Sequence, residues 1–313
     1  MKCKRCRERA EVKLPQHNAS FCRPCFIFFI QRQVQRTIDS DRMFTREEPV
    51  LIAVSGGKDS LALWDILQTL GYSTAGVHLS LGIGEYSARS TERTRAFAEE
   101  RGLELITVAL EDEGETVPEL ARFSRRPACS TCGLAKRHYM DRVADERGFR
   151  VLATGHNLDD EAARLMGNVM HWQMNYLAKQ SPKLEPGHER FSRKVRPLYR
   201  ISEYEMAVYS FFRGIDYIIE ECPNSVGASQ LVYKDALNRI EAEMPGSKLS
   251  FVSEFLRVAQ PGMAQLDTTP STGTCTSCGM PSFGELCAFC NLRQQVGAKR
   301  ARREAAAAAP KVA

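Results

Sequence analysis

Short apolar runs alternate with amphipathic, charged stretches along the central part of the chain. Four apolar runs predict buried strands: PVLIAVS (49–55), TAGVHLS (74–80), LELITVAL (103–110) and FRVLATG (149–155). The intervening stretches carry apolar residues at helical spacing and predict helices that end at Gly71, Gly102 and Gly148, followed by one long helix over 159–178. Repeated strand–helix units are typical of a parallel sheet with helices on both faces, so the predicted fold class is α/β.

Beyond residue 200 the pattern becomes mostly helical. Residues 236–244 and 248–260 bear amphipathic stripes. Glycine, proline and threonine in 260–274 indicate a linker. The last sixteen residues, AKRARREAAAAAPKVA, are basic and then of low complexity, which predicts a frayed end.

Composition narrows the class of protein. The chain has 313 residues, of which 43% are hydrophobic and 26% charged, which is enough for one substantial core with small satellites. It contains no apolar run of membrane-spanning length and no signal-peptide core at its start, so we expect a cytoplasmic protein without membrane contact. The net charge of +5 permits a nucleic-acid partner without requiring one.

Two of the cysteine blocks lie near the ends of the chain. Each consists of two Cys-x-x-Cys pairs, which supply the four thiolates of a closed zinc tetrahedron: Cys3, Cys6, Cys22 and Cys25, and then Cys275, Cys278, Cys287 and Cys290. A reducing cytosol favours metal sites over disulfides. We therefore predict a zinc finger at 1–30, a catalytic domain at 31–265, a second zinc finger at 266–300 and a tail at 301–313. The alternative is that the pairs are fortuitous or redox-active.

The first predicted strand runs into SGGKDS, residues 55–60, where the next helix begins. Gly56 and Gly57 allow the backbone to approach phosphate oxygens, and the free N–H groups of a helix start attract an anion. The spacing is not that of the usual triphosphate loop. Asp59 beside a phosphate implies an intervening Mg²⁺, while Lys58 either points outward or pairs with a charge. The alternative is an ordinary glycine turn capped by Asp or Ser.

A third cysteine group comprises Cys129, Cys132 and the distant Cys222. Three thiolates do not complete a zinc tetrahedron, but they fit three corners of a [4Fe–4S] cluster and leave one iron open. A catalytic disulfide pair formed by Cys132 and Cys222 is the other chemical interpretation. Three buried thiols without a joint role remain a third possibility.

SGGKDS after a strand resembles the pyrophosphate-binding loop of the N-type ATP pyrophosphatases. This resemblance implies the PP-loop fold, which is like that of the adenine nucleotide alpha hydrolases. It also implies that ATP adenylates a carbonyl-type oxygen and releases pyrophosphate. ATGHNLDDEA (153–162) resembles the second motif of that family, which implies that Gly155 lies near the nucleotide and Asp160 near Mg²⁺ or the reacting centre. Related thiolases often carry Glu-Thr where this chain has Ala163 and Arg164, so no role is assigned to those two residues.

Almost the whole chain resembles the two-zinc-finger tRNA 2-thiolation enzymes of the TtuA type, within the TtcA/TtuA family. The motifs that carry this resemblance are the two Cys₄ blocks, SGGKDS, CSTCGLAKR, GHNLDD and ECPNS. It implies a [4Fe–4S] cluster on Cys129, Cys132 and Cys222, a homodimer, and sulfur delivered by a ubiquitin-like carrier with a C-terminal thiocarboxylate. It also implies that ATP activates the C2 oxygen of a tRNA uridine, which sulfur then replaces.

The expected site contains Asp59 and Asp160 around Mg²⁺, and Lys136 as a charge stabiliser one helical turn after the cysteine pair. A solvated Lys136 is the alternative. The expected ATP-binding residues are those that surround the loop and end the first two strands: Ala53, Ser55, Gly56, Gly57, Lys58, Asp59, Ser60, Leu79 and Gly155. Of these, Ala53 and Leu79 would read the adenine through their backbones. His78, His156 and the other histidines are taken as structural.

Basic segments are candidates for contact with tRNA. In ERFSRKVRPLYR (189–200) basic and aromatic residues are interleaved, which suits phosphate contact and base stacking but equally an ordinary solvated face. Arg5, Arg7 and Arg9 flank the first zinc block, and 299–303 flank the second. These flanking residues are the better candidates.

Two rival functions are a non-enzymatic zinc-finger RNA-binding protein, which needs neither SGGKDS nor GHNLDD, and a small-molecule synthetase, which needs no terminal zinc fingers. Among tRNA targets, two terminal fingers argue against cytidine 32. Uridine 54 in the T-loop is preferred to uridine 34 in the anticodon, from overall likeness to the TtuA type.

Overall fold

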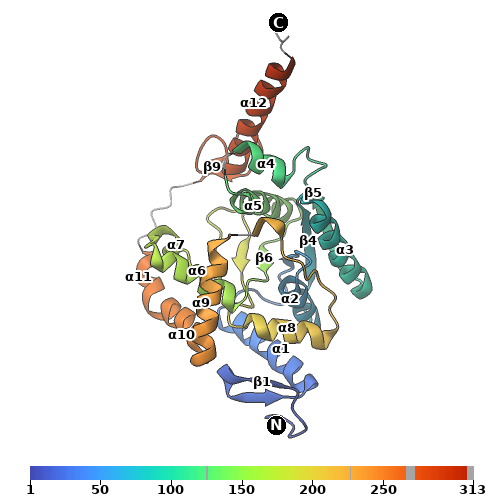
Figure 1. The fold of residues 1–313 in the computed structure, drawn as a ribbon, viewed down its shortest axis with the longest axis vertical. Helices are drawn as coiled ribbons and strands as arrows, with labels where there is room; N and C mark the ends of the chain where they lie inside the picture. Colours follow the sequence, from blue (N-terminus) through green and yellow to red (C-terminus); the bar gives the residue numbers. More distant parts are fainter. Residues whose placement is uncertain (125, 226, 266–271, 309–313) are drawn as a thin grey trace.

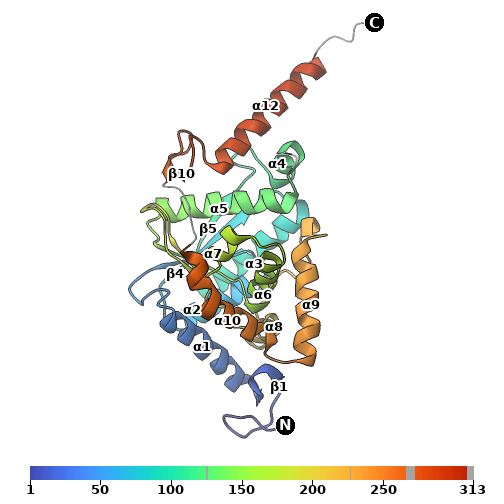
Figure 2. The same cartoon turned by 90° about the vertical axis from the view of Figure 1, so that its left-hand side faces the viewer.

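The computed structural model describes residues 1–124, 126–225, 227–265 and 272–308. Figures 1 and 2 show a central sheet wrapped by helices, with the N-terminal module at one end of the long axis and helix α12 projecting from the other. Among the described residues, no helix is both long and apolar enough to cross a lipid bilayer.

The N-terminal module is a small hairpin that leads into a helix. It comprises β1 (Val12–Leu14), the 3-10 turn η1 (Pro15–His17), β2 (Ala19–Phe21) and α1 (Arg23–Ser40). In α1, Phe26, Ile30, Val34 and Ile38 recur at every fourth position and are all buried, so they form one apolar stripe. This stripe is part of the main core. Helix α1 therefore connects the N-terminal module to the central region, and it runs without a break across the domain boundary expected at residue 30.

The main sheet has six strands in the order β5-β4-β3-β6-β8-β7. Its strands are β3 (Val50–Ala53), β4 (Thr74–Ser80), β5 (Glu104–Ala109), β6 (Val151–Thr154), β7 (Lys183–Leu184) and β8 (Arg193–Val195). All neighbouring pairs are parallel except β7 with β8. The α/β fold predicted from the sequence is confirmed, and the four predicted strands are β3, β4, β5 and β6.

Helices cover both faces of the sheet. The helices of the catalytic region are α2 (Lys58–Thr69), α3 (Gly84–Arg101), α4 (Val117–Ser124), α5 (Ala128–Glu146), α6 (Leu158–Met170), α7 (Met174–Ala178), α8 (Glu203–Arg213), α9 (Ser229–Glu243), α10 (Ser247–Glu254) and α11 (Gln260–Ala264), with a 3-10 turn η2 (Pro223–Ser225) and a π-helical turn η3 (Phe255–Ala259). Alternate residues of β3 face different cores. Val50 and Ile52 pack with α1, α2, α6 and α8, whereas Leu51 and Ala53 pack with α4, α5 and α12 (Ala288–Ala308).

The C-terminal module consists of β9 (Gly273–Thr274), β10 (Pro281–Ser282) and α12. It docks on α5 through Phe289, whose ring stacks on His138 at a centroid distance of 4.5 Å. The two terminal cysteine-containing modules therefore pack on opposite faces of the sheet, as Figure 1 shows.

The structure departs from the sequence predictions at two helices. The helix expected over 159–178 is broken into α6 and α7 by a turn in which Trp172 has a φ of +47°. The tail expected to fray is helical as far as Ala308, and its residues 309–313 lie outside the described residues. Part of the linker expected over 260–274 forms α11, and its residues 266–271 lie outside the described residues.

Candidate active site and metal centres

The loop between β3 and α2 has the geometry of an anion site. Gly56 has a φ of +75°, and a Cβ atom there would lie 2.7 Å from the carbonyl oxygen of Ser90, so only glycine fits. The Ser60 hydroxyl braces the loop from inside, since it accepts from the Ser55 N–H (3.1 Å) and donates to the Gly57 carbonyl (3.0 Å). The first N–H groups of α2 have no carbonyl partner within the helix and face this loop.

A second loop, which follows β6, lies directly against the first. A Cβ atom at Gly155 would come within 2.8 Å of the backbone nitrogen of Ser60, so the two loops can meet only because this residue is a glycine. Asn157 then caps α6 by accepting from the Asp160 N–H (3.1 Å), and its side-chain amide donates to Asp59 Oδ1 (3.2 Å). One asparagine thus positions both expected magnesium ligands, a role that sequence analysis missed.

A chain of alternating charges joins Asp59 to Asp160. Lys58 Nζ lies 3.1 Å from Asp59 and 2.7 Å from Glu203, while Lys234 Nζ lies 3.1 Å from Glu203 and 2.7 Å from Asp160. Lys58 is therefore a charge partner rather than an outward-facing residue.

The charges in this chain shift the pKa values of two carboxyl groups. Burial opposes the ionisation of Glu203, but hydrogen bonds and charges from Lys58 and Lys234 outweigh it and lower the pKa to about 2. Burial raises the pKa of Asp59, and the neighbouring charge of Asp160 adds to the rise despite the opposing effect of Lys58. Two facing carboxylates of this kind suit a divalent cation, which would relieve their mutual repulsion.

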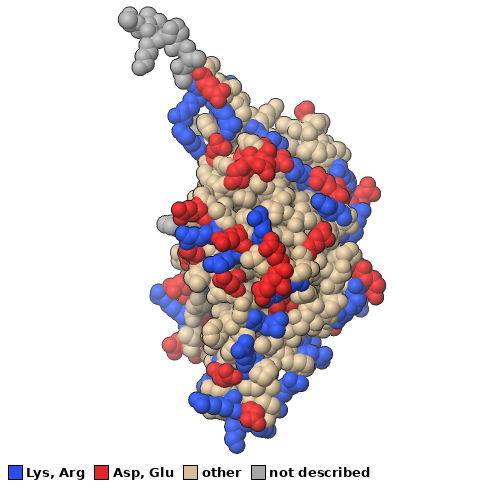
Figure 3. All heavy atoms as spheres, turned by 90° about the vertical axis from the view of Figure 1, so that its right-hand side faces the viewer, with Lys and Arg blue, Asp and Glu red and all other residues tan. Residues whose placement is uncertain are grey.

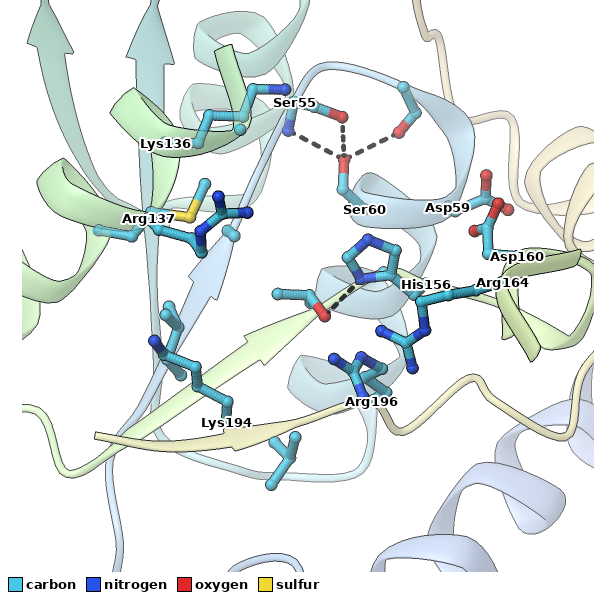
Figure 4. Close-up of a pocket in the computed structure, with 18 of the residues that line it drawn as sticks. Ser55, Asp59, Ser60, Lys136, Arg137, His156, Asp160, Arg164, Lys194 and Arg196 are labelled. Carbon is cyan, nitrogen blue, oxygen red and sulfur yellow. Dashed lines mark hydrogen bonds between the residues drawn. The ribbon is translucent and has the colours of Figure 1, made fainter. Parts of the chain in front are cut away.

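The two loops open into a cavity of about 500 Å³ (Figure 4). Its lining residues come from β3, α2, α5, β6, α6 and β8: Ala53, Ser55, Gly57, Asp59, Ser60, Gly133, Lys136, Arg137, Met140, Asp141, Leu152, Thr154, Gly155, His156, Asp160, Arg164, Lys194, Val195 and Arg196. Lys136 and Arg137 form no ion pair among the residues that the structure describes, so their charges are available to an anion in the cavity.

Several outcomes for the sequence predictions follow from this cavity. Ala53 lines it, whereas Leu79 is buried and is not among its lining residues. His78 is structural, as expected, because it is buried and hydrogen-bonds the Val54 carbonyl at 2.9 Å. His156, which had been taken as structural, and Arg164, which had been assigned no role, both line the cavity wall. His156 lies within the GHNLDD motif, which could have pointed to it, whereas no spacing signal pointed to Arg164.

The basic segment 189–200 is largely engaged within the protein. Its cations pair with acids on other elements: Arg190 with Asp145, Arg193 with Glu48, Lys194 with Asp141, Arg196 with Glu161 and Arg200 with Asp41. Tyr199 is also buried. Internal ion pairing accounts for this segment better than RNA contact or a plain solvated face.

The cysteines of the third group converge beside the cavity. Cys129 and Cys132 lie on the first turns of α5, and the Cys129 thiol contacts the Asn224 carbonyl oxygen (3.0 Å), two residues after Cys222. Burial raises the pKa of Cys132 against the opposing charge of Lys136, and the nearby Cys222 and Cys129 raise it further. The residues present fit a three-thiolate cluster site, whose ligand sulfurs must lie further apart than those around a single zinc ion.

The two terminal blocks form tight four-sulfur groups. In each block the four Sγ atoms lie within 4.8 Å of one another, and no other such group of His, Cys, Asp or Glu occurs in the described part of the chain. Cys6 and Cys22 have sulfurs 3.5 Å apart, and those of Cys278 and Cys287 are 3.9 Å apart. A zinc tetrahedron with 2.3 Å bonds requires about 3.8 Å.

In each block the surroundings stabilise the thiolate of one cysteine, whereas burial raises the pKa of another, Cys25 in the first block and Cys290 in the second. Burial opposes the charge on Cys3, but backbone N–H groups, among them that of Cys6, lower its pKa to about 6. Cys275 has a pKa lowered to about 6 in the same way, and it accepts from the Cys287 N–H at 3.2 Å. Both blocks therefore fit a bound metal ion.

Figure 3 shows Lys and Arg side chains over the whole of one face, including both ends of the long axis. One end is the N-terminal module, which carries Arg5, Arg7 and Arg9. The other end is α12, on which Arg302 and Arg303 are both exposed. The basic residues that flank the two cysteine blocks thus lie at opposite poles of the molecule.

Comparisons with known proteins agree with this arrangement. A family model described as the PP-loop domain matches residues 29–226, and one described as the N-terminal LIM domain of the 2-thiouridine synthetase TtuA matches residues 2–27. The chain is 49% identical to the tRNA-5-methyluridine(54) 2-sulfurtransferase of Thermus thermophilus, covering 93% of this chain and 91% of that protein. It is 40% identical to the protein of the same name from Pyrococcus horikoshii, covering 93% of each.

A solved structure shares the whole architecture. The U34-tRNA thiolase NcsA from Methanococcus maripaludis, with its [4Fe-4S] cluster, superposes with a TM-score of 0.80 at 28% identity. The match covers 94% of this chain and 96% of that one.

Proposed function

The chain belongs to the PP-loop family of tRNA 2-sulfurtransferases, and from that premise we propose that it replaces the C2 oxygen of uridine 54 in tRNA by sulfur, with cleavage of ATP to AMP and pyrophosphate. One observation carries the proposal. A single cavity brings the phosphate loop, the pair Asp59 and Asp160, and Lys136 together next to the cysteines on α5. Activation of an oxygen and its replacement by sulfur can therefore take place in one enclosed space.

ATP binds along the first loop in this proposal. Backbone N–H groups of residues 55–60 hold the phosphates, and Gly155 keeps the second loop close enough to enclose them. The backbone of Ala53, at the cavity wall, contacts the adenine. A phosphate oxygen would take the place of the Ser60 hydroxyl as the acceptor of the Ser55 N–H.

Asp59 and Asp160 would hold Mg²⁺, because their carboxylate oxygens are the ligands that this ion prefers. The ion supplies positive charge for the departing pyrophosphate. Lys58 and Lys234 neutralise the two aspartates in this structure. With Mg²⁺ bound, both would keep their ion pairs with Glu203 and so hold the backbone of the two loops in place. Lys136 has no acidic partner among the described residues and is free to stabilise negative charge on the activated uridine.

Cys129, Cys132 and Cys222 would hold the [4Fe–4S] cluster. When bound, the cluster supplies an iron position that has no protein ligand and can accept sulfur. In this chain α5 and the turn η2 bring the three cysteines together, with Cys129 exposed and Cys132 and Cys222 half-buried. The two Cys₄ blocks would each bind one structural zinc ion.

The proposal also covers the binding partners of the enzyme and its subcellular localisation. The tRNA would contact the basic residues at both poles of the molecule, and a ubiquitin-like protein with a C-terminal thiocarboxylate would deliver the sulfur. The enzyme would work in the cytoplasm as a homodimer. The domain division would be 1–30 and 266–300 for the zinc fingers and 31–265 for catalysis.

Thiolation of uridine 34 is the second candidate, favoured by the full-length likeness to a U34-tRNA thiolase. A binding-only zinc-finger protein has no use for the phosphate loop and its bracing contacts.

The test uses the protein reconstituted anaerobically with iron and sulfide, and supplied with ATP, Mg²⁺, inorganic sulfide as the sulfur donor and unmodified tRNA transcripts. We expect 2-thiouridine at position 54, with AMP and pyrophosphate as the other products. A transcript with cytidine at position 54 should remain unthiolated, while one with cytidine at position 34 should react normally. Asp59→Asn should lose turnover, whereas Asp112→Asn, at an exposed loop position, should not. Sulfur at position 34, or release of ADP and inorganic phosphate, would overturn the proposal.

A further inference from the structure

An exposed aromatic surface lies on the turn between α6 and α7, here called the 170–176 patch. Every residue from 170 to 176 is exposed. Three large side chains dominate the patch: Met170 is 62% exposed, Trp172 69% and Tyr176 66%. Two neighbouring residues on α9, Leu231 (43%) and Val232 (68%), extend it. Figures 1 and 2 show α6, α7 and α9 on the same flank of the molecule. A surface of this kind marks an interaction site.

The backbone beneath the patch is fixed. Leu177 and Ala178 are buried, and the Asn168 amide donates to Gln180 (2.7 Å), whose own amide donates to the Glu161 carbonyl (3.2 Å). A bulky residue with a left-handed φ is rare and costs free energy. Trp172 adopts such a φ, +47°, at the point where the two helices diverge. The turn therefore holds the indole in solvent although burial would be more favourable.

The charge of the segment indicates its partner. Residues 162–184 contain no Asp or Glu, but they include Arg164, Lys179 and Lys183. Within the patch itself, Gln173 and Asn175 alternate with the apolar side chains and are exposed. An acid-free stretch that presents exposed aromatic rings and amides matches single-stranded RNA, whose bases stack on rings and whose edges bond to amides. A protein-docking surface has no comparable reason to exclude acids over so long a stretch.

The patch begins at the end of a helix that also lines the active-site cavity. Arg164, on the same helix, lines the cavity. Met170 follows it by six positions, which is about 9 Å along the helix axis. That length corresponds to roughly three stacked bases at ~3.4 Å each. On α9, Lys234 contacts Asp160, and the preceding Tyr233 hydrogen-bonds His171 in the patch (3.2 Å).

We infer that the 170–176 patch stacks unpaired nucleotides that flank the target uridine and so holds the tRNA loop open over the cavity. This inference rests on the proposed function, because it assigns a subsite to the same tRNA substrate. Trp172 and Tyr176 are the stacking residues, and they position the substrate without touching the reacting atoms.

The experiment measures binding of an unmodified tRNA transcript by filter retention and thiolation with inorganic sulfide as the donor, so that no carrier protein takes part. The variant is Trp172→Ala with Tyr176→Ala. It should weaken tRNA binding about tenfold or more and raise KM for tRNA by a similar factor, with ATP affinity and thermal unfolding unchanged. The single variant Trp172→Phe should keep most of the wild-type affinity for tRNA, because a phenyl ring can still stack on a base. Phe211→Ala, which removes a 78% exposed ring on α8, is the matched control and should leave binding unchanged.

Wild-type tRNA affinity in the double alanine variant would overturn the inference while leaving the proposed function intact. The same holds if, in a parallel assay with a thiocarboxylate carrier protein as the donor, that variant loses activity while its sulfide-dependent thiolation stays at the wild-type level, because the patch would then be a protein-docking surface. If the wild-type protein itself neither binds nor thiolates tRNA, the proposed function fails and this inference fails with it.

Discussion

The backbone N–H of Ile218 donates to the carbonyl oxygen of Gly56 at 2.9 Å. This hydrogen bond ties the phosphate loop to the segment 215–222, which ends at Cys222. Two ion pairs to α3, Arg93 with Asp216 and Arg89 with Glu220, hold the same segment in place. The conformation of the phosphate loop is thus linked through one peptide group to the position of a proposed cluster ligand.

Gly56→Ala should therefore disturb both sites. A Cβ atom there would lie 2.7 Å from the Ser90 carbonyl oxygen, so the loop must move. We expect ATP affinity to fall about tenfold or more, since the loop's N–H groups lose their alignment, and iron content after reconstitution to fall as well. Calorimetry and iron analysis measure the two effects.

Gly114→Ala is the matched control for this change. Gly114 has a φ of +74°, like the +75° of Gly56, but a Cβ atom there would meet nothing within 4 Å. Both variants should lose about 1 kcal/mol of stability from the left-handed backbone, but only Gly56→Ala should lose ATP affinity. Equal ATP affinity in the two variants would contradict the steric argument.

Glu203 should contribute stability that depends on pH. Its pKa is lowered from 4.5 to about 2 in the folded protein, so the contribution is complete above pH 4.5 and is lost as the pH falls toward 2. Because the side chain is 38% exposed, solvent screening limits the effect to about 1 kcal/mol at pH 7. The difference in free energy of unfolding between wild type and Glu203→Gln should shrink steadily over that pH range in urea titrations. A difference that stays constant with pH would show that ionic pairing is not its cause.

The strands and the phosphate loop could be predicted because their signals are local. β4 matches its predicted span, residues 74–80, because an apolar run and its flanking turns decide where a strand lies. The break at Trp172 could not be predicted in this way, since the segment holds no glycine or proline at the break. Tertiary packing decides it: Leu177 and Ala178 are buried, and Gln260 of α11 donates to the Ala178 carbonyl.

The charged residues of the site show the same limit. The composition of a cationic segment such as 189–200 predicts a nucleic-acid-binding surface. The acids that neutralise it, for example Asp41 and Asp145, lie on elements that are distant in the sequence. Lys234 contacts Asp160 only because α9 packs on α6. Such pairings depend on how helices pack, and no spacing within one helix reveals them.

The two Cys₄ blocks should each bind one zinc ion, independently of each other. Purified protein is expected to contain about two zinc ions per chain, and Cys25→Ser or Cys290→Ser should each remove one. Cys25→Ser should also destabilise the catalytic region more, because Cys25 lies on α1, which packs into the main core. Metal analysis and thermal unfolding measure these losses. A fully folded, zinc-free protein after expression with excess zinc would refute the assignment.

The cluster ligands decide the chemistry of sulfur transfer. Replacing Cys129, Cys132 or Cys222 by Ser should abolish iron binding and thiolation together, because three thiolates are the minimum that holds a [4Fe–4S] cluster with one open iron. ATP binding should survive in all three variants, since residues 55–60 keep their own bracing contacts. Zinc content should stay at the wild-type level, which separates these cysteines from the terminal blocks. Iron analysis, absorbance and nucleoside analysis give the readouts after anaerobic reconstitution. Full thiolation by iron-free protein would show that Cys132 and Cys222 work as a redox pair instead.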